Sequence, residues 1–283
     1  MDNIETPRPP RPDIQEPSEE SGGVPDPTPE YLQQTEREST RLESPQPLLI
    51  ISDLNGTLLH RPDSYGNPRT AVPRPYAPLF IDYMIKSFWF AFWSSARPQN
   101  VRHMVNAIIH PENKAKLVAM WDRSRFGLTR DDYCGRTQCY KRLSLMWEDP
   151  DVARTHPHYE TGGRWSQANT VLIDDTATKA RSEPFNLIEI PEFADKQDKY
   201  DFVLPQVHDY INELAFQSDV SAYIRAHPFQ PQEDPEMAFE VAQEDETTSQ
   251  GPRVVRNSKR RRPSKLKTDR RRGQHEGVFS DSF

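Results

Sequence analysis

The stretch LLIISDLNGTLLHRP (48–62) decides the fold class of this chain. Residues 48–51 are all apolar, which is typical of a strand buried on both faces of a parallel sheet. Asp53 follows where this strand should end, and Gly56 and Thr57 come directly after it. The stretch therefore predicts a buried strand that carries a carboxylate to one edge of a sheet.

Short apolar runs and helical patterns alternate after this stretch. The runs predict buried strands over 48–52, 88–94, 170–174 and 186–193, and the periodic segments predict helices over 79–87, 97–109 and 201–216. Pro98 and Pro205 suit the first turns of the last two helices. This alternation indicates an α/β fold, a doubly wound, Rossmann-like parallel sheet with helices on both faces. Ligands bind such sheets at the carboxyl ends of the strands.

Composition divides the chain into a folded centre and tails. The 27 prolines, the 28% charged residues and the low 34% hydrophobic content favour disorder outside the patterned region. We predict a disordered Pro/Glu-rich tail over 1–46 and a folded domain over 47–229. An acidic disordered linker is expected over 230–252 and a basic disordered tail over 253–283.

The basic tail holds eleven Lys or Arg and a single Asp between Arg253 and Arg272. Its two basic clusters within 256–272 indicate a nuclear import signal that would bind an import receptor, although a partner patch or a solvated tail is also compatible with them. No aromatic residues interleave with the basic ones, so stacking on single-stranded nucleic acid is not indicated. We expect no direct nucleic-acid site in the folded domain.

Several features bear on the compartment. Two cysteines, Cys134 and Cys139, are too few for a disulfide framework and favour a reducing compartment. The longest apolar run, 80–93, is interrupted by Asp82 and Lys86, and no window reaches the length of a membrane span. The N-terminus resembles neither a secretory signal nor a mitochondrial presequence. We therefore predict a nuclear or cytoplasmic protein.

Polar residues follow three of the predicted strands. Asp53 follows the first strand, Ser94 and Ser95 follow the second, and Asp174 and Asp175 end the third. Burying polar groups at one edge of a sheet is costly unless they bind something. Clustered carboxylates suit a hard cation such as Mg²⁺ with substrate phosphate, and a helix N-terminus suits a phosphate dianion.

In this order, the pieces LLIISDLNGTLL, AFWSSARPQNV, CYKRLSLMW and TVLIDDTATKARSEPFNLIEIPEF resemble the haloacid dehalogenase superfamily. Within it, the chain is similar to the Fcp/small-CTD-phosphatase branch, also called NLI-interacting-factor-like phosphatases, over roughly residues 47–215. The resemblance implies the haloacid dehalogenase fold. It also implies a Mg²⁺-dependent phosphatase that acts on phosphoserine or phosphothreonine in a protein or peptide through an aspartyl-phosphate.

The resemblance also implies roles for single residues. Asp53 matches the nucleophile, and Asn55 stands where these phosphatases usually have a second Asp as general acid and base. Ser94 matches the hydroxyl residue that contacts the phosphoryl oxygens. Lys141 matches the lysine that neutralises the phosphate, and Thr57 matches a position of the substrate-binding loop.

The same resemblance implies a metal centre. Asp53, the backbone carbonyl of Asn55 and Asp175 match positions that ligate Mg²⁺ directly. Asp174 matches the acidic residue beside these ligands.

Asn55 changes what the resemblance implies about turnover. An amide cannot exchange protons near neutral pH, so general acid–base help worth about 10²–10⁴-fold should be lost. The alternatives are a slow phosphatase or a pseudophosphatase that captures a phosphorylated partner. The latter includes a role like that of the translocase receptors of the mitochondrial inner membrane, which the lack of a presequence and of a membrane span disfavours. Deamidation at Asn55-Gly56 could restore an Asp, and His60 could act as a substitute base.

Two further groups of residues have competing interpretations. His156 and His158 flank a proline and are expected to be surface residues rather than metal ligands. Four arginines between the second and third motifs could receive substrate phosphates or pair with neighbouring aspartates; they are Arg123, Arg125, Arg130 and Arg136.

Overall fold

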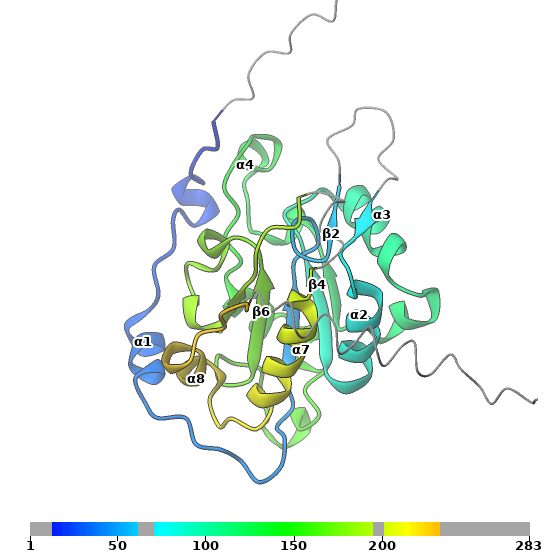
Figure 1. Cartoon of the computed structure of the whole chain (residues 1–283). Coiled ribbons are helices and arrows are strands. Elements are labelled where there is room, and N and C mark those ends of the chain that lie inside the picture. The colour runs from blue at the N-terminus through cyan, green and yellow to red at the C-terminus, as the bar shows by residue number, and fades with distance from the viewer. Residues whose placement is uncertain (1–12, 62–70, 195–200, 233–283) are drawn as a thin grey trace, which may run out of the picture. The chain divides into compact units, whose positions relative to one another are not determined.

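The computed structural model describes residues 13–61, 71–194 and 201–232 (Figure 1). The basic tail with the expected import signal at 256–272 lies outside these residues, as does the acidic linker apart from 230–232. Those assignments therefore remain predictions. Among the described residues, no helix combines the length and the apolar character that crossing a bilayer requires.

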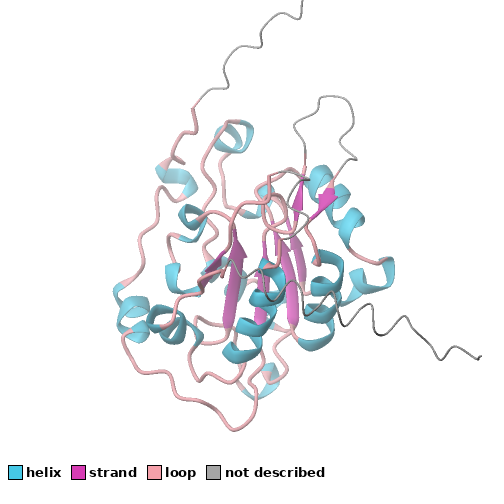
Figure 2. Ribbon diagram, viewed as in Figure 1, coloured by secondary structure: helices cyan, strands magenta, loops and turns pink. Residues whose placement is uncertain are grey.

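The centre of the fold is a five-stranded parallel sheet in the order β5-β4-β1-β6-β7 (Figure 2). Its strands are β1 (Leu49–Ser52), β4 (Trp89–Trp93), β5 (Ala119–Trp121), β6 (Thr170–Asp174) and β7 (Leu187–Glu189). A separate antiparallel pair joins β2 (Leu59–His60) to β3 (Val72–Pro73). The predicted α/β class with a parallel sheet is confirmed.

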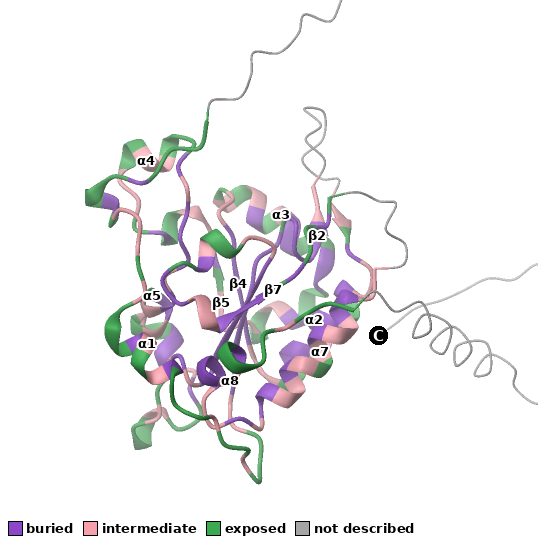
Figure 3. Cartoon of the chain, turned by 60° about the vertical axis from the view of Figure 1, so that its left-hand side comes forward, coloured by how far each residue is buried: buried purple, intermediate pink, exposed green. Residues whose placement is uncertain are grey.

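Alternate residues of the strands face two different hydrophobic cores. Ile50 of β1 belongs to the core on one face, and its neighbours Leu49 and Ile51 belong to the core on the other. Both cores are buried, and Figure 3 shows the strands purple at the centre of the described chain. A sheet covered on both faces explains why its strands are continuous apolar runs in the sequence.

One face is covered by the longest helices, α2 (Ala77–Ser87), α3 (Pro98–Ile108) and α7 (Val203–Leu214). In α3, four buried side chains recur at helical spacing, as predicted; they are Val101, Met104, Val105 and Ile108. Pro98 and Pro205 lie in the first turns of α3 and α7, where a missing N–H costs no helical hydrogen bond.

The other face is covered by short helices joined by irregular chain. Leu143, Met146 and Val152 of these helices pack in the second core. The short elements are α5 (Leu143–Glu148), α6 (Pro150–Ala153), η3 (Arg123–Arg125), η4 (Tyr159–Thr161), η5 (Ala177–Ala180) and η6 (Pro184–Asn186). The remaining helices are η1 (Glu19–Ser21), α1 (Pro29–Thr35), η2 (Pro111–Lys116), α4 (Arg130–Cys134) and α8 (Val220–Ala226).

The predicted disordered tail over 1–46 must be corrected for residues 13–46, which run along the folded domain (Figure 1). Gln15 makes a parallel bridge with Thr137, and Ser18 donates a hydrogen bond to Asp132 at 2.6 Å. Tyr31 is buried, and its hydroxyl donates to Asn186 at 3.1 Å. This segment gains its order from polar contacts with the domain, which composition does not reveal.

One predicted strand is much shorter than expected, and one strand of the sheet was not predicted. β7 covers only Leu187–Glu189 of the strand expected over 186–193, and β5 was not predicted. β5 is a three-residue edge strand whose Met120 is exposed, and it ends a run of apolar residues, 117–121, that was not predicted as a strand.

Candidate active site

The carboxyl ends of β4, β1 and β6 lie side by side because these strands are neighbours in the sheet. Ser52 is in register with Phe92 of β4 and with Ile173 of β6. The next residues along the three strands therefore bring Asp53 beside Asp174. The predicted meeting of these acidic residues at one edge of the sheet is what the structure shows.

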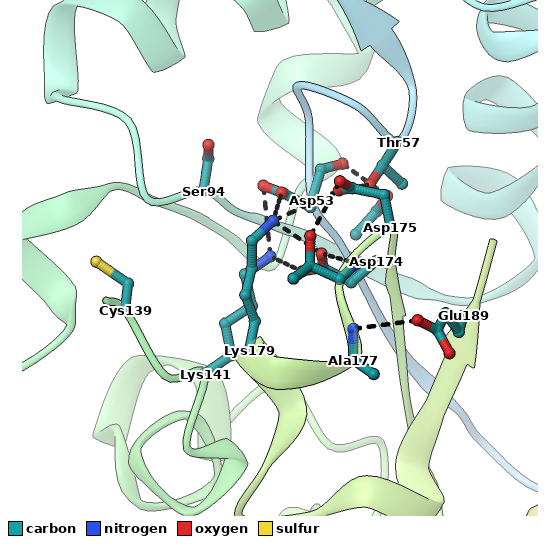
Figure 4. A network of polar contacts seen from close by, with 12 residues as sticks. Asp53, Thr57, Ser94, Cys139, Lys141, Asp174, Asp175, Ala177, Lys179 and Glu189 are labelled. Atoms are coloured by element: carbon teal, nitrogen blue, oxygen red, sulfur yellow. Dashed lines mark hydrogen bonds and ion pairs between the residues drawn. The ribbon is translucent and has the colours of Figure 1, made fainter. Parts of the chain in front are cut away.

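Asp53 is buried between two lysine ammonium groups (Figure 4). Its Oδ2 accepts a hydrogen bond from Lys179 Nζ at 2.7 Å, and its Oδ1 lies 3.4 Å from Lys141 Nζ. Oδ1 accepts no hydrogen bond from any described residue. One oxygen of this carboxylate is therefore hydrogen-bonded, and the other is buried beside Lys141 without a hydrogen bond.

The two lysines keep Asp53 ionised. Burial acts to raise the pKa of its carboxyl group, but the charges of Lys141 and Lys179 outweigh burial and lower the pKa to about 2. A carboxylate with so low a pKa is charged at any physiological pH, which is the form required of a nucleophile or a metal ligand.

Asp174 shares both lysines with Asp53. Its Oδ2 accepts from Lys141 Nζ at 2.6 Å, its Oδ1 accepts from Lys179 Nζ at 2.8 Å, and the backbone N–H of Thr176 also donates to Oδ1. Asp174 is completely buried, and burial raises its pKa, although the two lysines act in the opposite direction.

Asp175 is held from three sides. Thr57 Oγ1 and Thr176 Oγ1 each donate to one of its oxygens at 3.0 Å, and Lys179 Nζ lies 3.4 Å from Oδ1. The backbone at Gly56 has φ of 89°, and a Cβ there would lie 2.8 Å from Asp175 Oδ2. Only glycine permits both this conformation and this close approach.

The loop after Asp53 is clamped by a buried arginine. Arg74 donates to the backbone carbonyl of Thr57 at 2.9 Å and to that of Pro191 at 2.9 Å, and it forms an ion pair with Asp201 at 2.6 Å. These contacts fix the backbone of Thr57 and thereby the hydroxyl that reaches Asp175. Arg74 was not predicted, because it precedes α2 in a segment without periodicity.

Asn55 and Ser94 lie at the same edge of the sheet but do not contact the acidic cluster through any recorded side-chain bond. Asn55 is exposed, and its Oδ1 accepts from the backbone N–H of Arg61 at 2.8 Å. Ser94 is buried, accepts from the N–H of Ala96 at 3.3 Å, and stands apart from the lysines in Figure 4. His60 lies in β2, and no contact among the described residues joins it to Asp53.

The donor set fits a hard divalent cation. Oxygens of Asp53, Asp174 and Asp175 lie within 4.8 Å of one another, and this is the metal-ligating group found within the described parts of the chain. Carboxylate oxygens are the ligands that such cations prefer. Oδ1 of Asp53 is a buried polar atom that lacks a hydrogen bond, as expected where a further group binds.

Lys179 is the residue of this cluster that was not predicted. It lies in η5, four residues after Asp175, so one tight turn brings its side chain back over the strand end. Burial acts to lower its pKa, but the surrounding carboxylates raise the pKa well above its ordinary value. The sequence could have indicated this contact, because Lys179 lies only four residues after Asp175.

The arginines considered as phosphate receptors have different surroundings. Arg123 donates to the backbone carbonyls of Tyr133, Asp132 and Gly135 at 3.0–3.1 Å, so it holds the C-terminal end of α4. Arg125 pairs with Asp149 at 3.4 Å. Arg123 and Arg136 also line a pocket of about 690 Å³ that reaches Thr176 and Lys179.

The prediction that His156 and His158 are surface residues is half wrong. His158 is exposed, but His156 is buried and packs edge-on against Trp165 at 4.5 Å between ring centroids. Its Nδ1 accepts from the N–H of His158, so it closes a local turn.

The chain was also compared with known proteins. The sequence profile of the NLI interacting factor-like phosphatases matches residues 48–221. An uncharacterized FCP1 homology domain-containing protein of Schizosaccharomyces pombe is 34% identical over 194 residues, which cover 64% of this chain and 77% of the relative.

Two solved structures were also found to be similar. One is the fission yeast RNA polymerase II CTD phosphatase Fcp1 bound to beryllium fluoride, with 13% identity and a TM-score of 0.34, and the other is a second Fcp1 structure with 15% and 0.35. They match 77% and 76% of this chain, which spans 53% and 63% of theirs. On the profile match, which extends over more than half of its length, the chain belongs to the NLI interacting factor-like phosphatases.

Proposed function

We propose that this chain is a slow phosphatase that removes phosphate from phosphoserine or phosphothreonine in a protein or peptide, with Asp53 as its nucleophile and Mg²⁺ as its cation. The family to which the chain belongs supports the reaction class. The observation that carries the proposal is the state of Asp53, which is buried, ionised and has one oxygen, Oδ1, without a hydrogen bond.

The reaction begins when Asp53 Oδ1 attacks phosphorus. A bond forms between Oδ1 and phosphorus, the bond between phosphorus and the serine or threonine oxygen breaks, and that oxygen leaves with the electron pair. Covalent catalysis of this kind replaces one difficult displacement by two easier ones. Water then attacks the aspartyl-phosphate, which releases inorganic phosphate and restores the Asp53 carboxylate.

The lysines and Ser94 serve phosphate binding in this proposal. Lys141 lies 3.4 Å from Asp53 Oδ1 and is fully buried, so it neutralises negative charge at the attacking oxygen. Ser94 is the hydroxyl at the end of the neighbouring strand, where it would donate to a phosphoryl oxygen. Thr57 acts indirectly, because its hydroxyl is engaged with Asp175.

Asp53, Asp175 and the backbone carbonyl of Asn55 would hold Mg²⁺, with Asp174 beside them. A bound cation supplies positive charge that neutralises the phosphate and polarises its oxygens. The all-oxygen donor set favours Mg²⁺ over softer ions.

Asn55 limits both steps. The leaving oxygen needs a proton and the attacking water must lose one. The Asn55 amide can neither give nor take up a proton near neutral pH. Aryl phosphates, whose leaving groups need little protonation, should therefore be better substrates than phosphoserine. The aspartyl-phosphate should accumulate, because its hydrolysis also lacks a base.

The proposal is tested by turnover of an aryl phosphate and a phosphoserine peptide with Mg²⁺. Four proteins are compared: the wild type, Asp53→Asn, Asn55→Asp and the double variant. We expect slow wild-type turnover of the aryl phosphate, about 10²–10⁴-fold faster turnover by Asn55→Asp, and none in either Asp53 variant. Activity that survives Asp53→Asn contradicts the proposal.

A second candidate is capture of a phosphorylated partner without turnover. The observation that favours it is the side chain of Asn55, which is exposed and bonded to the backbone of Arg61 rather than to the cluster. In this case the wild type binds a phosphoserine peptide in an Asp53-independent manner and releases no phosphate, whereas Asn55→Asp gains turnover.

A further inference from the structure

The ammonium group of Lys179 lies among all three carboxylates of the candidate metal centre. Its Nζ is 2.7 Å from Asp53 Oδ2, 2.8 Å from Asp174 Oδ1 and 3.4 Å from Asp175 Oδ1. The same three side chains form the group that could hold a metal ion. The Lys179 ammonium group and a divalent cation would therefore draw on the same carboxylates.

Lys141 contacts the cluster differently. It reaches the opposite oxygens, Asp53 Oδ1 at 3.4 Å and Asp174 Oδ2 at 2.6 Å, and among the described residues it forms no ion pair with Asp175. Figure 4 shows the two ammonium groups entering the cluster from adjacent chain segments. Of these two lysines, only Lys179 contacts all three carboxylates.

The charges favour exchange over joint occupancy. Three carboxylates and two lysines leave the cluster with one net negative charge. A divalent cation in place of the Lys179 ammonium brings this charge to zero, whereas a cation added beside it leaves one net positive charge in a buried site. An ammonium group and a divalent cation that contact the same carboxylates repel each other strongly in a buried site.

Lys179 also has a path out of the cluster. Its side chain is 14% exposed, whereas that of Lys141 is 0% exposed. Lys179 and Thr176 line the pocket of about 690 Å³ at this edge of the sheet. A rotation of the long side chain can therefore carry its charge into water, which a buried lysine cannot do.

We infer that Lys179 is a built-in competitor for the metal position: its ammonium group and a divalent cation bind the same carboxylates in turn, and the cation enters only when Lys179 turns out toward the pocket. The inference rests on the metal centre of the proposed function. It adds a residue that sets the cation affinity and keeps the carboxylates neutralised when no cation is bound.

Lysine labelling tests the exchange directly. The full-length protein is treated briefly with acetic anhydride, with and without saturating Mg²⁺, and the modification of each lysine is measured by mass spectrometry. We expect labelling of Lys179 to rise severalfold with Mg²⁺, while Lys141 stays protected in both states. Labelling of Lys179 that is unchanged or reduced at saturating Mg²⁺ overturns the inference.

Cation affinity provides a second test. Mn²⁺ binding is measured by electron paramagnetic resonance for the wild type, Lys179→Met and Lys179→Gln, the last as a polar variant in case the apolar one folds poorly. We expect both to bind Mn²⁺ at least about tenfold more tightly than the wild type, because the competing charge is gone. Equal or weaker binding by both variants overturns the inference.

Two matched controls test whether the gain in Mn²⁺ affinity comes from vacating the metal position or only from removing a positive charge. Lys86→Met removes a surface lysine that pairs with Asp82, and it should leave Mn²⁺ affinity unchanged. Lys141→Met removes one charge from the same cluster without vacating the position at Asp175, so its gain should be smaller than that of Lys179→Met. Equal gains from both cluster lysines would show a general charge effect and refute competition for one position.

Turnover of the aryl phosphate in the same preparations distinguishes the two proposals. Exposure of Lys179 by Mg²⁺ without turnover supports the exchange and counts against the phosphatase. Turnover with Lys179 protected at saturating Mg²⁺ supports the phosphatase and refutes the exchange.

Discussion

Replacement of Lys141 by methionine tests the electrostatics of the buried cluster. Lys141 is completely buried, and its ammonium group bonds Asp174, which is also completely buried, and faces Asp53. Methionine has a similar length, so the substitution removes the charge without opening a large cavity. Two buried carboxylates then share the single ammonium group of Lys179.

The size of the effect follows from this arrangement. Removing one partner of a buried ion pair costs about 3–5 kcal/mol of folding free energy. Because Lys179 still pairs with both carboxylates, we expect the loss in Lys141→Met to be near the lower end of this range. A loss of about 3 kcal/mol corresponds to a decrease in Tm of about 6–12 °C for a domain of this size. The assay is urea unfolding at pH 7 with a thermal melt, and Lys86→Met serves as a surface control expected to change stability by less than about 1 kcal/mol.

The pH dependence provides a sharper test. Burial already raises the folded-state pKa of Asp174, and without the opposing charge of Lys141 this pKa should rise further above its value in the unfolded chain. The folded variant then takes up a proton as the pH falls, so its deficit relative to the wild type should shrink from pH 7 toward pH 5. A variant as stable as the wild type, or a deficit independent of pH, would refute the reasoning.

Three further predictions concern Asp53, the glycine beside Asp175, and the docked segment over residues 13–46. Asp53→Asn should be less stable than the wild type near pH 7, and this difference should disappear as the pH falls from about 4 to 2. The Asp53 carboxyl group of the wild type has a folded pKa of about 2, below its unfolded value, so its contribution of about 2 kcal/mol to folding is lost over that range. Urea unfolding of both proteins as a function of pH measures the difference. Gly56→Ala should destabilise by more than the roughly 1 kcal/mol expected of Gly127→Ala, because both glycines have positive φ but only at Gly56 would the added Cβ meet a side chain, that of Asp175; equal losses in thermal melts would contradict this. Tyr31→Phe should cost about 1–3 kcal/mol, because the buried hydroxyl bonds Asn186 and the N–H of Phe185; proteolysis within residues 13–46 should also become faster, and an unchanged rate would count against the docking of this segment.

The sheet could be predicted from the sequence because burial on both faces leaves a continuous apolar run. β6 has the predicted bounds, β1 begins one residue later than predicted, and β4 is one residue shorter at each end. The same runs predicted the positions of Asp53 and Asp174, since carboxyl ends of neighbouring parallel strands meet at one edge. β5 also lies at the end of an apolar run, 117–121, so this edge strand carries the same signal although it was not predicted.

Residues outside the strands were harder to predict. Lys141 lies in a segment without periodicity, and it was indicated by the need for a positive charge at the site and by the resemblance to a family. Lys179 enters the site through the turn of η5, and Arg74 through contacts with chain that is distant in sequence. The order of residues 13–46 depends on docking to the finished domain. Such features depend on tertiary contacts, which neither composition nor periodicity encodes.

The most direct test of the proposed function is to trap the covalent intermediate on Asp53. The wild-type protein is mixed with an aryl phosphate and Mg²⁺, quenched in acid, and digested for mass spectrometry. We predict one phosphoryl group on the peptide that contains Asp53, a lower amount in Asn55→Asp because it hydrolyses the intermediate faster, and none in Asp53→Asn. A wild-type protein without the adduct, together with an Asn55→Asp variant that shows no turnover, would contradict a nucleophilic role for Asp53.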